Sequence, residues 1–514
     1  MKNLQLNNRK LKNMKMEDNT MKKTEKINRN FQGINNTLLV DEYELTMMQG
    51  FFLTGRNNKV VFDMFYRNNP CGNGYAIAAG LESVIEWIQN LHFGQDQIKI
   101  LRDKGIYCKE FLNYLENFKF SGTIYAVEEG TVVFPMEPLL RVEAPIIEAQ
   151  YVETALLNFI NHQSLIATKA ARVCYAAKGD AVMEFGLRRA QGKDAGTVGA
   201  RAAVIGGCAI TSNVLCAEFY NIPTSGTHAH SWVMSFDSEY EAFETYANIY
   251  PNNAILLVDT YDTLRSGVPN AIKVFDKLKK EGRLNGKYGI RLDSGDLAYL
   301  SKKARIMLDE AGFENAIISA SNDLDEYLIQ DLKMQGAKIS LWGVGTHLIT
   351  SKDCPSFGGV YKLAAKFNKE QDCYKPVIKL SENVEKITNP GKKKIYRIVD
   401  KKTKTFLADL ICLEHELVNE KEDLQIFDPN ATWKKTTFVA GTFEVEELLV
   451  PIFVDGEYVY SEPSVEQIKE RCNTQKEHLW DEVKRLVNPH KYYVDLSKEL
   501  YDLKKELIKE HETF

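Results

Sequence analysis

Short apolar segments with strand character alternate with longer helical segments between about residues 180 and 365. Helical patterns fill the gaps, as at 263–280, 298–310 and 324–334. Such an alternation is typical of parallel βα units, and seven or eight of them in a row indicate a barrel. The predicted strands are Ala181–Phe185, Cys208–Thr211, Ile222–Ser225, Ala254–Val258, Tyr288–Leu292, Ala316–Ser319, Lys338–Trp342 and Gly359–Leu363. This stretch predicts an α/β fold built on an irregular (β/α) barrel.

Polar residues follow nearly all of these strands. They are Arg188-Arg189, Ser212-Asn213, Gly226-Thr227-His228-Ala229-His230, Asp259-Thr260-Tyr261-Asp262, Asp293-Ser294-Gly295-Asp296, Ser321-Asn322-Asp323 and Gly343-Val344-Gly345-Thr346-His347. The active site of a (β/α) barrel is built from the loops at the carboxyl ends of its strands. One such loop is compatible with an ordinary turn, but seven in register indicate a catalytic face.

The segment from Pro223 to Ser231 holds two histidines two residues apart. In an extended chain, His228 and His230 point to the same side. The preceding Gly226-Thr227 pair lets backbone and hydroxyl approach a bound anion closely. Taken alone, this segment also fits a turn whose histidines hydrogen-bond to the backbone. A zinc site needs further histidine ligands on later strands, and only His347 is available there.

Two features of the predicted face suit phosphate. Gly343 and Gly345 can present bare backbone N–H groups, with the Thr346 hydroxyl as a further donor. Arg188 and Arg189 offer planar forks that match phosphate oxygens. A Gly-x-Gly-Thr sequence is also a common turn, and adjacent arginines often form surface ion pairs, so the indication comes from their combination.

Asp293 and Asp296 flank Ser294-Gly295 in the loop after another predicted strand. This spacing suits ribose hydroxyls, or a Mg²⁺ ion that retains several of its waters.

The rest of the chain divides by composition and pattern. Residues 1–30 are rich in Lys, Asn and Met and lack a periodic apolar face, which predicts a disordered basic tail. Residues 31–165 predict an N-terminal α+β domain, and residues 166–380 hold the barrel. Residues 381–514 form a C-terminal accessory region that we expect to pack on the N-terminal domain.

Local patterns refine this division. Asp41 is a candidate helix N-cap, with Glu44 three residues later as in a capping box. Apolar residues at helical spacing predict helices over 76–91, over about 147–177 and over a charged tail at 465–510.

Bulk composition limits the class of protein. The 514 residues are 44% apolar and 26% charged, as in ordinary globular proteins, and the net charge of −5 gives no electrostatic reason to expect nucleic acid as a partner. Nine cysteines without a CxxC pair indicate free thiols in a reducing compartment. The first thirty residues lack an apolar signal core, and no window reaches the roughly 20 apolar residues of a membrane span. We therefore expect a cytoplasmic protein without a membrane partner.

Four motifs in this order resemble those of the nicotinate phosphoribosyltransferase family, as does the segment Leu39–Met47. The motifs are Glu184-Phe185-Gly186-Leu187-Arg188-Arg189-Ala190-Gln191-Gly192, Gly226-Thr227-His228-Ala229-His230-Ser231, Arg291-Leu292-Asp293-Ser294-Gly295-Asp296-Leu297 and Gly343-Val344-Gly345-Thr346. The resemblance runs from about residue 37 to 365 and leaves only the basic tail clearly outside it.

The resemblance implies a type II phosphoribosyltransferase with a second α+β domain, usually a homodimer. Such enzymes join nicotinate to 5-phosphoribosyl 1-diphosphate, giving nicotinate mononucleotide and diphosphate. ATP hydrolysis is coupled through a transient phosphohistidine, which the motif places at His230, and Mg²⁺ assists. Nicotinamide phosphoribosyltransferase has the same fold and is an alternative, as is a barrel metal-dependent hydrolase that uses the histidine pair.

The resemblance also implies roles for other residues. Nicotinate contacts carry over to Tyr43, Thr227 and Arg291, while His228 receives no catalytic role. Contacts to the phosphoribosyl diphosphate carry over to four residues, which are Thr346, Gly345, Arg188 and Asp293.

Overall fold

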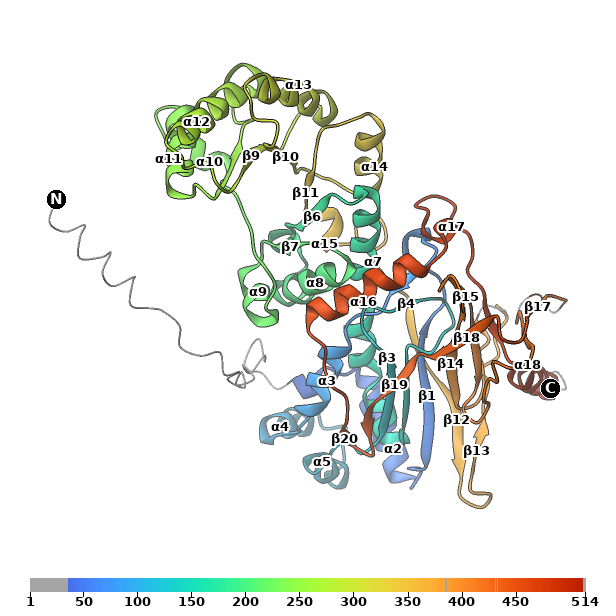
Figure 1. The fold of residues 1–514 in the computed structure, drawn as a ribbon. Helices are drawn as coiled ribbons and strands as arrows, with labels where there is room; N and C mark the ends of the chain where they lie inside the picture. The colour runs from blue at the N-terminus through green and yellow to red at the C-terminus, as the bar shows by residue number, and fades with distance from the viewer. Residues whose placement is uncertain (1–35, 384–385, 430, 432, 512–514) are drawn as a thin grey trace, which may run out of the picture. The chain divides into compact units, whose positions relative to one another are not determined.

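The computed structural model describes residues 36–383, 386–429, 431 and 433–511 (Figure 1). The expected disordered tail at 1–30 lies outside these residues. Strands of the described chain form three large sheets and one two-stranded sheet. None of the described helices combines the length and apolarity that a membrane span requires.

An antiparallel sheet dominates the N-terminal part. Its strand order is β13-β12-β1-β5-β3-β19-β20. The bounds are β1 Lys59–Tyr66, β3 Thr123–Val127, β5 Leu140–Pro145, β12 Gly359–Asn368, β13 Cys373–Pro376, β19 Leu449–Val454 and β20 Glu457–Tyr458. The helices of this part are α2 Glu42–Leu53, α3 Leu81–Gln89, α4 Gln95–Asp103, α5 Lys109–Glu116 and α6 Ile146–Tyr151. The chain order of the strands shows that this sheet combines N-terminal, post-barrel and C-terminal segments.

The C-terminal part forms a six-stranded sheet in the order β17-β16-β21-β15-β14-β18. Its strands are β14 Lys393–Asp400, β15 Phe406–Leu413, β16 Leu424–Phe427, β17 Lys435–Phe438, β18 Phe443–Glu447 and β21 Val494–Leu496. The predicted helical tail at 465–510 was wrong in part. It divides into α16 Val465–His478, α17 Asp481–Lys484 and α18 Lys498–His511, with β21 between the last two. β21 pairs with β15 in parallel, so tertiary pairing overrides the charged helical pattern there.

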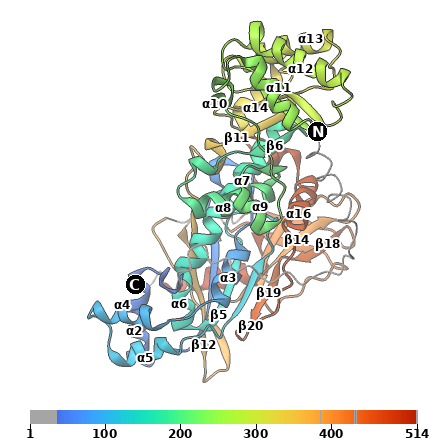
Figure 2. The same cartoon turned by 90° about the vertical axis from the view of Figure 1, so that its left-hand side faces the viewer.

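A parallel sheet carries the predicted catalytic face, and it appears in Figure 2 beside α10, α11 and α14. Its order is β7-β6-β11-β10-β9-β8, and it curls into a half-barrel. The strands are β6 Ala181–Glu184, β7 Ile210–Thr211, β8 Asn253–Leu257, β9 Lys287–Leu292, β10 Ile317–Ala320 and β11 Leu341–Val344. The connecting helices are α8 Lys193–Gly206, α9 Val214–Tyr220, α10 His230–Met234, α11 Glu239–Ile249, α12 Val268–Lys280, α13 Leu297–Glu310, α14 Glu326–Met334 and α15 Thr346–Ile349. The α/β fold class is confirmed.

Two of the eight predicted barrel strands were wrong. Gly359–Leu363 belongs to β12, which pairs antiparallel with β1 in the other sheet. Apolar periodicity identifies a strand but carries no information about which sheet it joins. Ile222–Ser225 contributes one parallel bridge, from Thr224 to Thr211, and Pro223 lacks the N–H that a continuous ladder needs.

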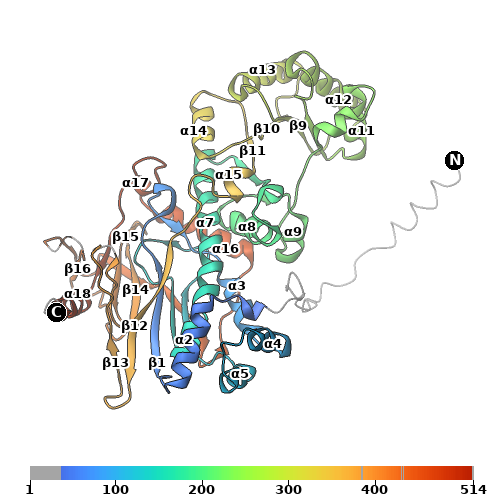
Figure 3. The ribbon, with the colours of Figure 1, turned by 180° about the vertical axis from the view of Figure 1, so that it is seen from behind.

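Helix α7 (Glu153–Ala177) connects these parts, as Figure 3 shows from behind. It packs against α3, α8, α14 and β12, and most of its residues are buried. Arg172 and Lys169 of α7 form ion pairs with the buried Glu326 of α14, at 2.9 and 2.6 Å. Together with α6, this helix confirms the prediction over 147–177.

Two local predictions in the first domain were wrong in part. Asp41 is the N-cap of α2, but its side chain makes no capping bond and instead accepts a hydrogen bond from Thr154 Oγ1 at 2.7 Å. Glu44 also accepts from Thr154, so no capping box forms. The predicted helix over 76–91 begins only at Leu81, because Gly80 has a left-handed φ of 104° and residues 76–77 form a short strand, β2. A Cβ at Gly80 would lie 2.6 Å from the Phe159 carbonyl oxygen, so a glycine is required there.

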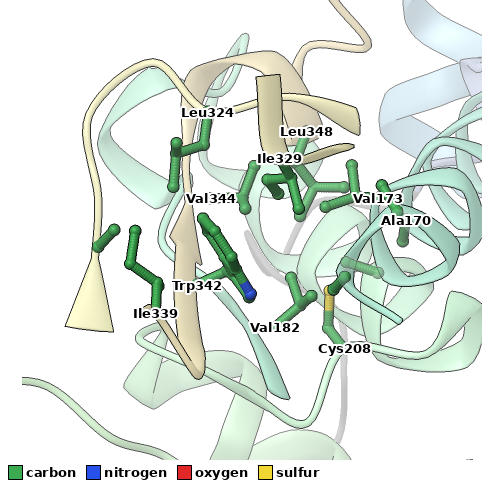
Figure 4. Close-up of a cluster of buried hydrophobic side chains, with 14 of the residues drawn as sticks. Ala170, Val173, Val182, Cys208, Leu324, Ile329, Ile339, Trp342, Val344 and Leu348 are labelled. Atoms are coloured by element: carbon green, nitrogen blue, oxygen red, sulfur yellow. The ribbon is translucent and has the colours of Figure 1, made fainter. Parts of the chain in front are cut away.

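Buried side chains of the parallel sheet pack against α7 and α14 (Figure 4). Trp342 of β11 is fully buried, and its Nε1 donates to Asp180 Oδ2 at 3.0 Å. Val344 and Leu348, on either side of the Gly345-Thr346 turn, belong to the same cluster. The residues on both sides of the turn that follows β11 are therefore packed in the hydrophobic core.

Candidate active site

His230 lies at the start of α10, with its imidazole directed at the carboxyl end of β8. Its Nδ1 lies 3.1 Å from Thr260 Oγ1. Its Nε2 lies 3.7 Å from Asp293 Oδ2 and 4.0 Å from Asp259 Oδ1, both longer than a hydrogen bond. The side chain is 39% exposed. One ring nitrogen is thus oriented by a threonine, and the other remains available to a ligand.

Asp259 is a site residue whose role the sequence did not reveal, although its polar loop was noted. Its carboxylate is 2% exposed, and Oδ2 accepts hydrogen bonds from the Asp293 backbone N–H at 2.8 Å and from Ser294 Oγ at 2.7 Å. Its Oδ1, which faces His230, is buried without a hydrogen-bond partner among the described residues. Because β8 and β9 are adjacent, Asp259 fixes the loop that carries Asp293.

Arg291, near the end of β9, donates a hydrogen bond from Nη1 to Thr227 Oγ1. Burial lowers the pKa of Arg291, the charges of Asp293 and Asp259 raise it, and the charge of Arg188 lowers it. A guanidinium nevertheless stays protonated in proteins, so the site holds a partly buried permanent cation. These interactions bring Thr227, Arg291 and Asp293 together at the carboxyl ends of the strands.

Arg188 and the Gly345-Thr346 turn belong to adjacent strand ends. β6 pairs with β11, and the Phe185 backbone N–H donates to the Val344 carbonyl at 2.8 Å. Arg188 is exposed in the short 3₁₀ helix Leu187–Arg189 that follows β6. A Cβ at Gly345 would lie 3.2 Å from the Phe185 carbonyl oxygen, so a side chain there would be crowded. The structure thus places a cation and a small-residue turn at neighbouring strand ends.

His228 and His230 do not share a site, contrary to the expectation from their spacing. His228 is 6% exposed, its Nε2 accepts a hydrogen bond from the Leu257 backbone N–H at 3.2 Å, and its ring packs edge-on against Tyr246. Burial lowers the pKa of His228 to about 4, so the ring is neutral at pH 7. The extended geometry ends at Ala229, the N-cap of α10, which turns His230 toward a different environment. His228 therefore supports the strand end.

Tyr43 is the one proposed nicotinate contact that lies apart from the others. It is 47% exposed on α2, and its hydroxyl lies 3.3 Å from Glu44 Oε1. The charges that act on the Tyr43 hydroxyl are those of Glu153 on α7, Glu44 on α2 and Asp41 at the N-cap of α2. Within the described residues, no hydrogen bond or ring contact joins Tyr43 to Thr227 or Arg291 of the same chain.

Asp293 and Asp296 differ in what they can bind. Asp296 is the N-cap of α13, where its Oδ1 accepts from the Tyr299 backbone N–H at 2.9 Å. Asp293 Oδ1 accepts from Ser321 Oγ, while its Oδ2 points at His230 from a side chain that is 34% exposed. Asp293 is the better placed of the two to meet a ligand, since Asp296 already performs a structural task.

Family models match nearly all of the described chain. The N-terminal domain of nicotinate phosphoribosyltransferase matches residues 38–161, the family's central model matches 181–411, and its C-terminal domain matches 392–504. The C-terminal match confirms that the resemblance extends past residue 365.

Comparisons with individual relatives support the same family as the family models. The chain is 46% identical over 475 residues to nicotinate phosphoribosyltransferase of Bacillus subtilis, covering 92% of this chain and 95% of that one. It is 30% identical to the human nicotinate phosphoribosyltransferase, covering 91% of this chain and 95% of that one. A crystal structure of human nicotinic acid phosphoribosyltransferase superposes with a TM-score of 0.78 at 28% identity, covering 91% of this chain and 99% of that one. The chain therefore belongs to the nicotinate phosphoribosyltransferase family of enzymes.

Proposed function

We propose that this chain transfers the phosphoribosyl group of 5-phosphoribosyl 1-diphosphate to nicotinate, and that ATP hydrolysis is coupled to the transfer through a phosphohistidine at His230. The products are nicotinate mononucleotide and diphosphate, so the enzyme serves NAD biosynthesis. The observation that supports this most is the placement of His230, with Nδ1 on Thr260 and Nε2 open between two carboxylates.

His230 is suited to act as a nucleophile toward ATP. A neutral imidazole has a lone pair on one ring nitrogen, which makes that nitrogen a competent nucleophile. That lone pair attacks the γ-phosphorus, the bond to the bridging oxygen breaks, and ADP leaves with the electron pair. Thr260 holds the ring so that Nε2 is the attacking atom.

The carboxylates around His230 fit a magnesium ion shared with substrate phosphates. A phosphoryl group on Nε2 would face Asp293 and the unpartnered oxygen of Asp259, and three anions together need a cation. Mg²⁺ is commonly held by one or two carboxylates plus phosphate oxygens, and Asp293 has an oxygen free for this. When bound, the ion neutralises developing negative charge on the phosphates.

The transfer itself depends on positioning. Displacement of diphosphate by the pyridine nitrogen builds positive charge on the ribose ring, so both reactants must be held in line. Arg291 and the Thr227 hydroxyl bind the nicotinate carboxylate, while Arg188, Gly345 and Thr346 bind the phosphoribosyl donor. Arg291 is partly buried, and a charge-assisted hydrogen bond is stronger there than in water.

Tyr43 completes the nicotinate site only from a second copy of the chain. It carries the aromatic ring expected to pack on the base, yet its surroundings share no residue with those of Arg291. A homodimer in which α2 of one protomer meets the strand ends of its partner accounts for both facts. We therefore propose that the active form is a homodimer.

The charge of Arg291 favours nicotinate over nicotinamide, because only nicotinate carries a carboxylate. A hydrolase that uses both histidines on one metal receives no support, since His228 is buried and already accepts a hydrogen bond from Leu257.

Two measurements test the proposal. Purified protein with 5-phosphoribosyl 1-diphosphate and Mg²⁺ should consume nicotinate much faster than nicotinamide, and ATP should increase the rate. Incubation with γ-labelled ATP should leave acid-labile, base-stable label on His230. A preference for nicotinamide would overturn the choice of substrate, and label on another residue would overturn the assignment of His230.

A further inference from the structure

His347, which directly follows the Gly345-Thr346 turn in the chain, lies close to Asp325 and Lys352. The His347 side chain is 9% exposed, and its Nδ1 lies 3.4 Å from Asp325 Oδ2. Its Nε2 lies 3.1 Å from the Lys352 ammonium nitrogen. One buried ring therefore bridges a carboxylate and an exposed ammonium group.

The chemistry of the lysine fixes the tautomer of the histidine. An ammonium group has three donors and no acceptor, so Nε2 must accept from Lys352. The ring proton of the neutral form then sits on Nδ1, which lies 3.4 Å from Asp325 Oδ2 and makes no hydrogen bond to the described residues. Asp325 is itself fixed, because its Oδ1 accepts from the Leu328 backbone N–H at 2.7 Å as the N-cap of α14.

The surrounding backbone ties Lys352 to the same turn. The Lys352 backbone N–H donates to the His347 carbonyl at 3.2 Å, and His347 directly follows Thr346. Ser351 and Asp353, on either side of Lys352, have left-handed φ values of 44° and 73°. Such conformations are costly for residues other than glycine and occur often at functional sites.

Lys352 is a cation for which the described part of the chain supplies no anionic partner. No carboxylate of the described residues forms an ion pair with it, whereas two of its three N–H donors remain after the bond to His347. A compact ammonium bonded to the residue that follows the Gly345-Thr346 turn is suited to a phosphate group.

We propose that Lys352 binds the 5-phosphate of the phosphoribosyl substrate and that His347, buried next to Asp325, is a positioning residue that holds the ammonium through Nε2. The inference rests on the proposed function, because it takes Gly345 and Thr346 as contacts of the phosphoribosyl group. His347 acts through Lys352 and touches no substrate.

The test combines binding and kinetics. Lys352→Ala should weaken the affinity for ribose 5-phosphate and raise the KM for 5-phosphoribosyl 1-diphosphate by about 10–100-fold, the effect of one charge-assisted hydrogen bond. The KM for nicotinate and the affinity for inorganic diphosphate should stay within about twofold, because neither ligand carries the 5-phosphate. Lys303→Ala, which removes an exposed lysine on α13, is the charge control and should change none of these values.

Histidine variants test the positioning role. His347→Leu keeps the ring's volume but removes the acceptor, so it should reproduce most of the Lys352→Ala effect. His347→Gln places an amide oxygen near the position of Nε2 and should restore much of the affinity. The double variant His347→Leu/Lys352→Ala should be no weaker than Lys352→Ala alone, since both changes remove one interaction.

The outcomes separate this inference from the proposed function. If wild type binds ribose 5-phosphate but transfers nothing to nicotinate, the proposed function fails and the Lys352 test still applies through binding. If wild type is active and Lys352→Ala keeps the wild-type KM for 5-phosphoribosyl 1-diphosphate and the wild-type affinity for ribose 5-phosphate, the inference is overturned. Equal increases in the KM values for nicotinate and 5-phosphoribosyl 1-diphosphate overturn it too. If His347→Leu does not fold, as judged by circular dichroism, the comparison of Lys352→Ala with Lys352→Arg decides the assignment to phosphate.

Discussion

The His230 imidazole and the Thr260 hydroxyl lie within hydrogen-bond distance, with Nδ1 and Oγ1 separated by 3.1 Å. Thr260 follows β8, whereas His230 begins α10, so the contact joins two strand-end loops. It holds the ring with Nε2 toward Asp259 and Asp293. This orientation gives His230 its proposed role and makes that role testable.

His230→Ala should reduce protein labelling and ATP hydrolysis to background while leaving some ATP-independent transfer. The reason is that His230 is proposed to serve the energy-coupling half-reaction rather than the glycosyl transfer. Label from γ-labelled ATP and the rate of nicotinate mononucleotide formation without ATP are the two measurements.

The neighbouring histidine provides the matched control. His228→Asn should retain labelling, because His228 is buried and bonded to the Leu257 backbone. Its thermal midpoint should fall, since that buried N–H loses its best partner. Loss of label in this variant, in folded protein, would transfer the coupling role to His228.

Thr260→Val should slow labelling of His230 by about 3–10-fold, which corresponds to the free energy of one neutral hydrogen bond. Valine keeps the branched shape but cannot orient Nδ1. Thr260→Ser keeps the hydroxyl and should label at close to the wild-type rate. Equal rates in all three proteins would show that Asp259 and Asp293 orient the ring without Thr260.

The sequence predicted the parallel strands and the polar loops at their ends, because alternating patterns and strand-end polarity are local features. It misassigned Gly359–Leu363, because pairing with β1 depends on residues about 300 positions away. It missed the role of Asp259 for a related reason. That carboxylate is defined by bonds to Asp293 and Ser294 across adjacent strands, and nothing in its own segment sets it apart from Asp262.

Arg291→Ala should lower kcat/KM for nicotinate by about 10–100-fold, the worth of a charge-assisted hydrogen bond of roughly 1.5–3 kcal/mol. Nicotinamide forms no such bond, so its low kcat/KM should change little. The preference for nicotinate over nicotinamide should therefore become smaller. Thr227→Val, which removes the hydroxyl that accepts from Arg291, should give a smaller change in the same direction. An equal loss for both bases would instead assign Arg291 to the phosphoribosyl donor.

Glu44→Gln should stabilise the protein at neutral pH and lose this advantage in acid. Burial raises the pKa of Glu44 from its ordinary value of 4.5 to about 7, with a smaller lowering by its hydrogen bond to Thr154. A carboxyl that binds its proton more tightly in the folded chain favours folding fully below pH 4.5, and this contribution is lost as the pH rises through 7. The unfolding free energy of the variant relative to wild type should therefore rise by about 2–3 kcal/mol between pH 4 and pH 8.

Glu42→Gln, two residues earlier on α2, provides a control of opposite sign. Hydrogen bonds from Lys104 and Tyr107 lower the pKa of Glu42, so its ionised form favours folding above pH 4.5 and this contribution is lost as the pH falls. The thermal midpoint of Glu42→Gln relative to wild type should therefore be lower at pH 7 and converge with it in acid. Midpoints of the three proteins from pH 4 to pH 8 in matched buffers measure both trends. If Glu44→Gln and Glu42→Gln shift in the same direction with pH, the raised pKa of Glu44 is wrong, and its unpartnered Oε2 must reach solvent or a cation.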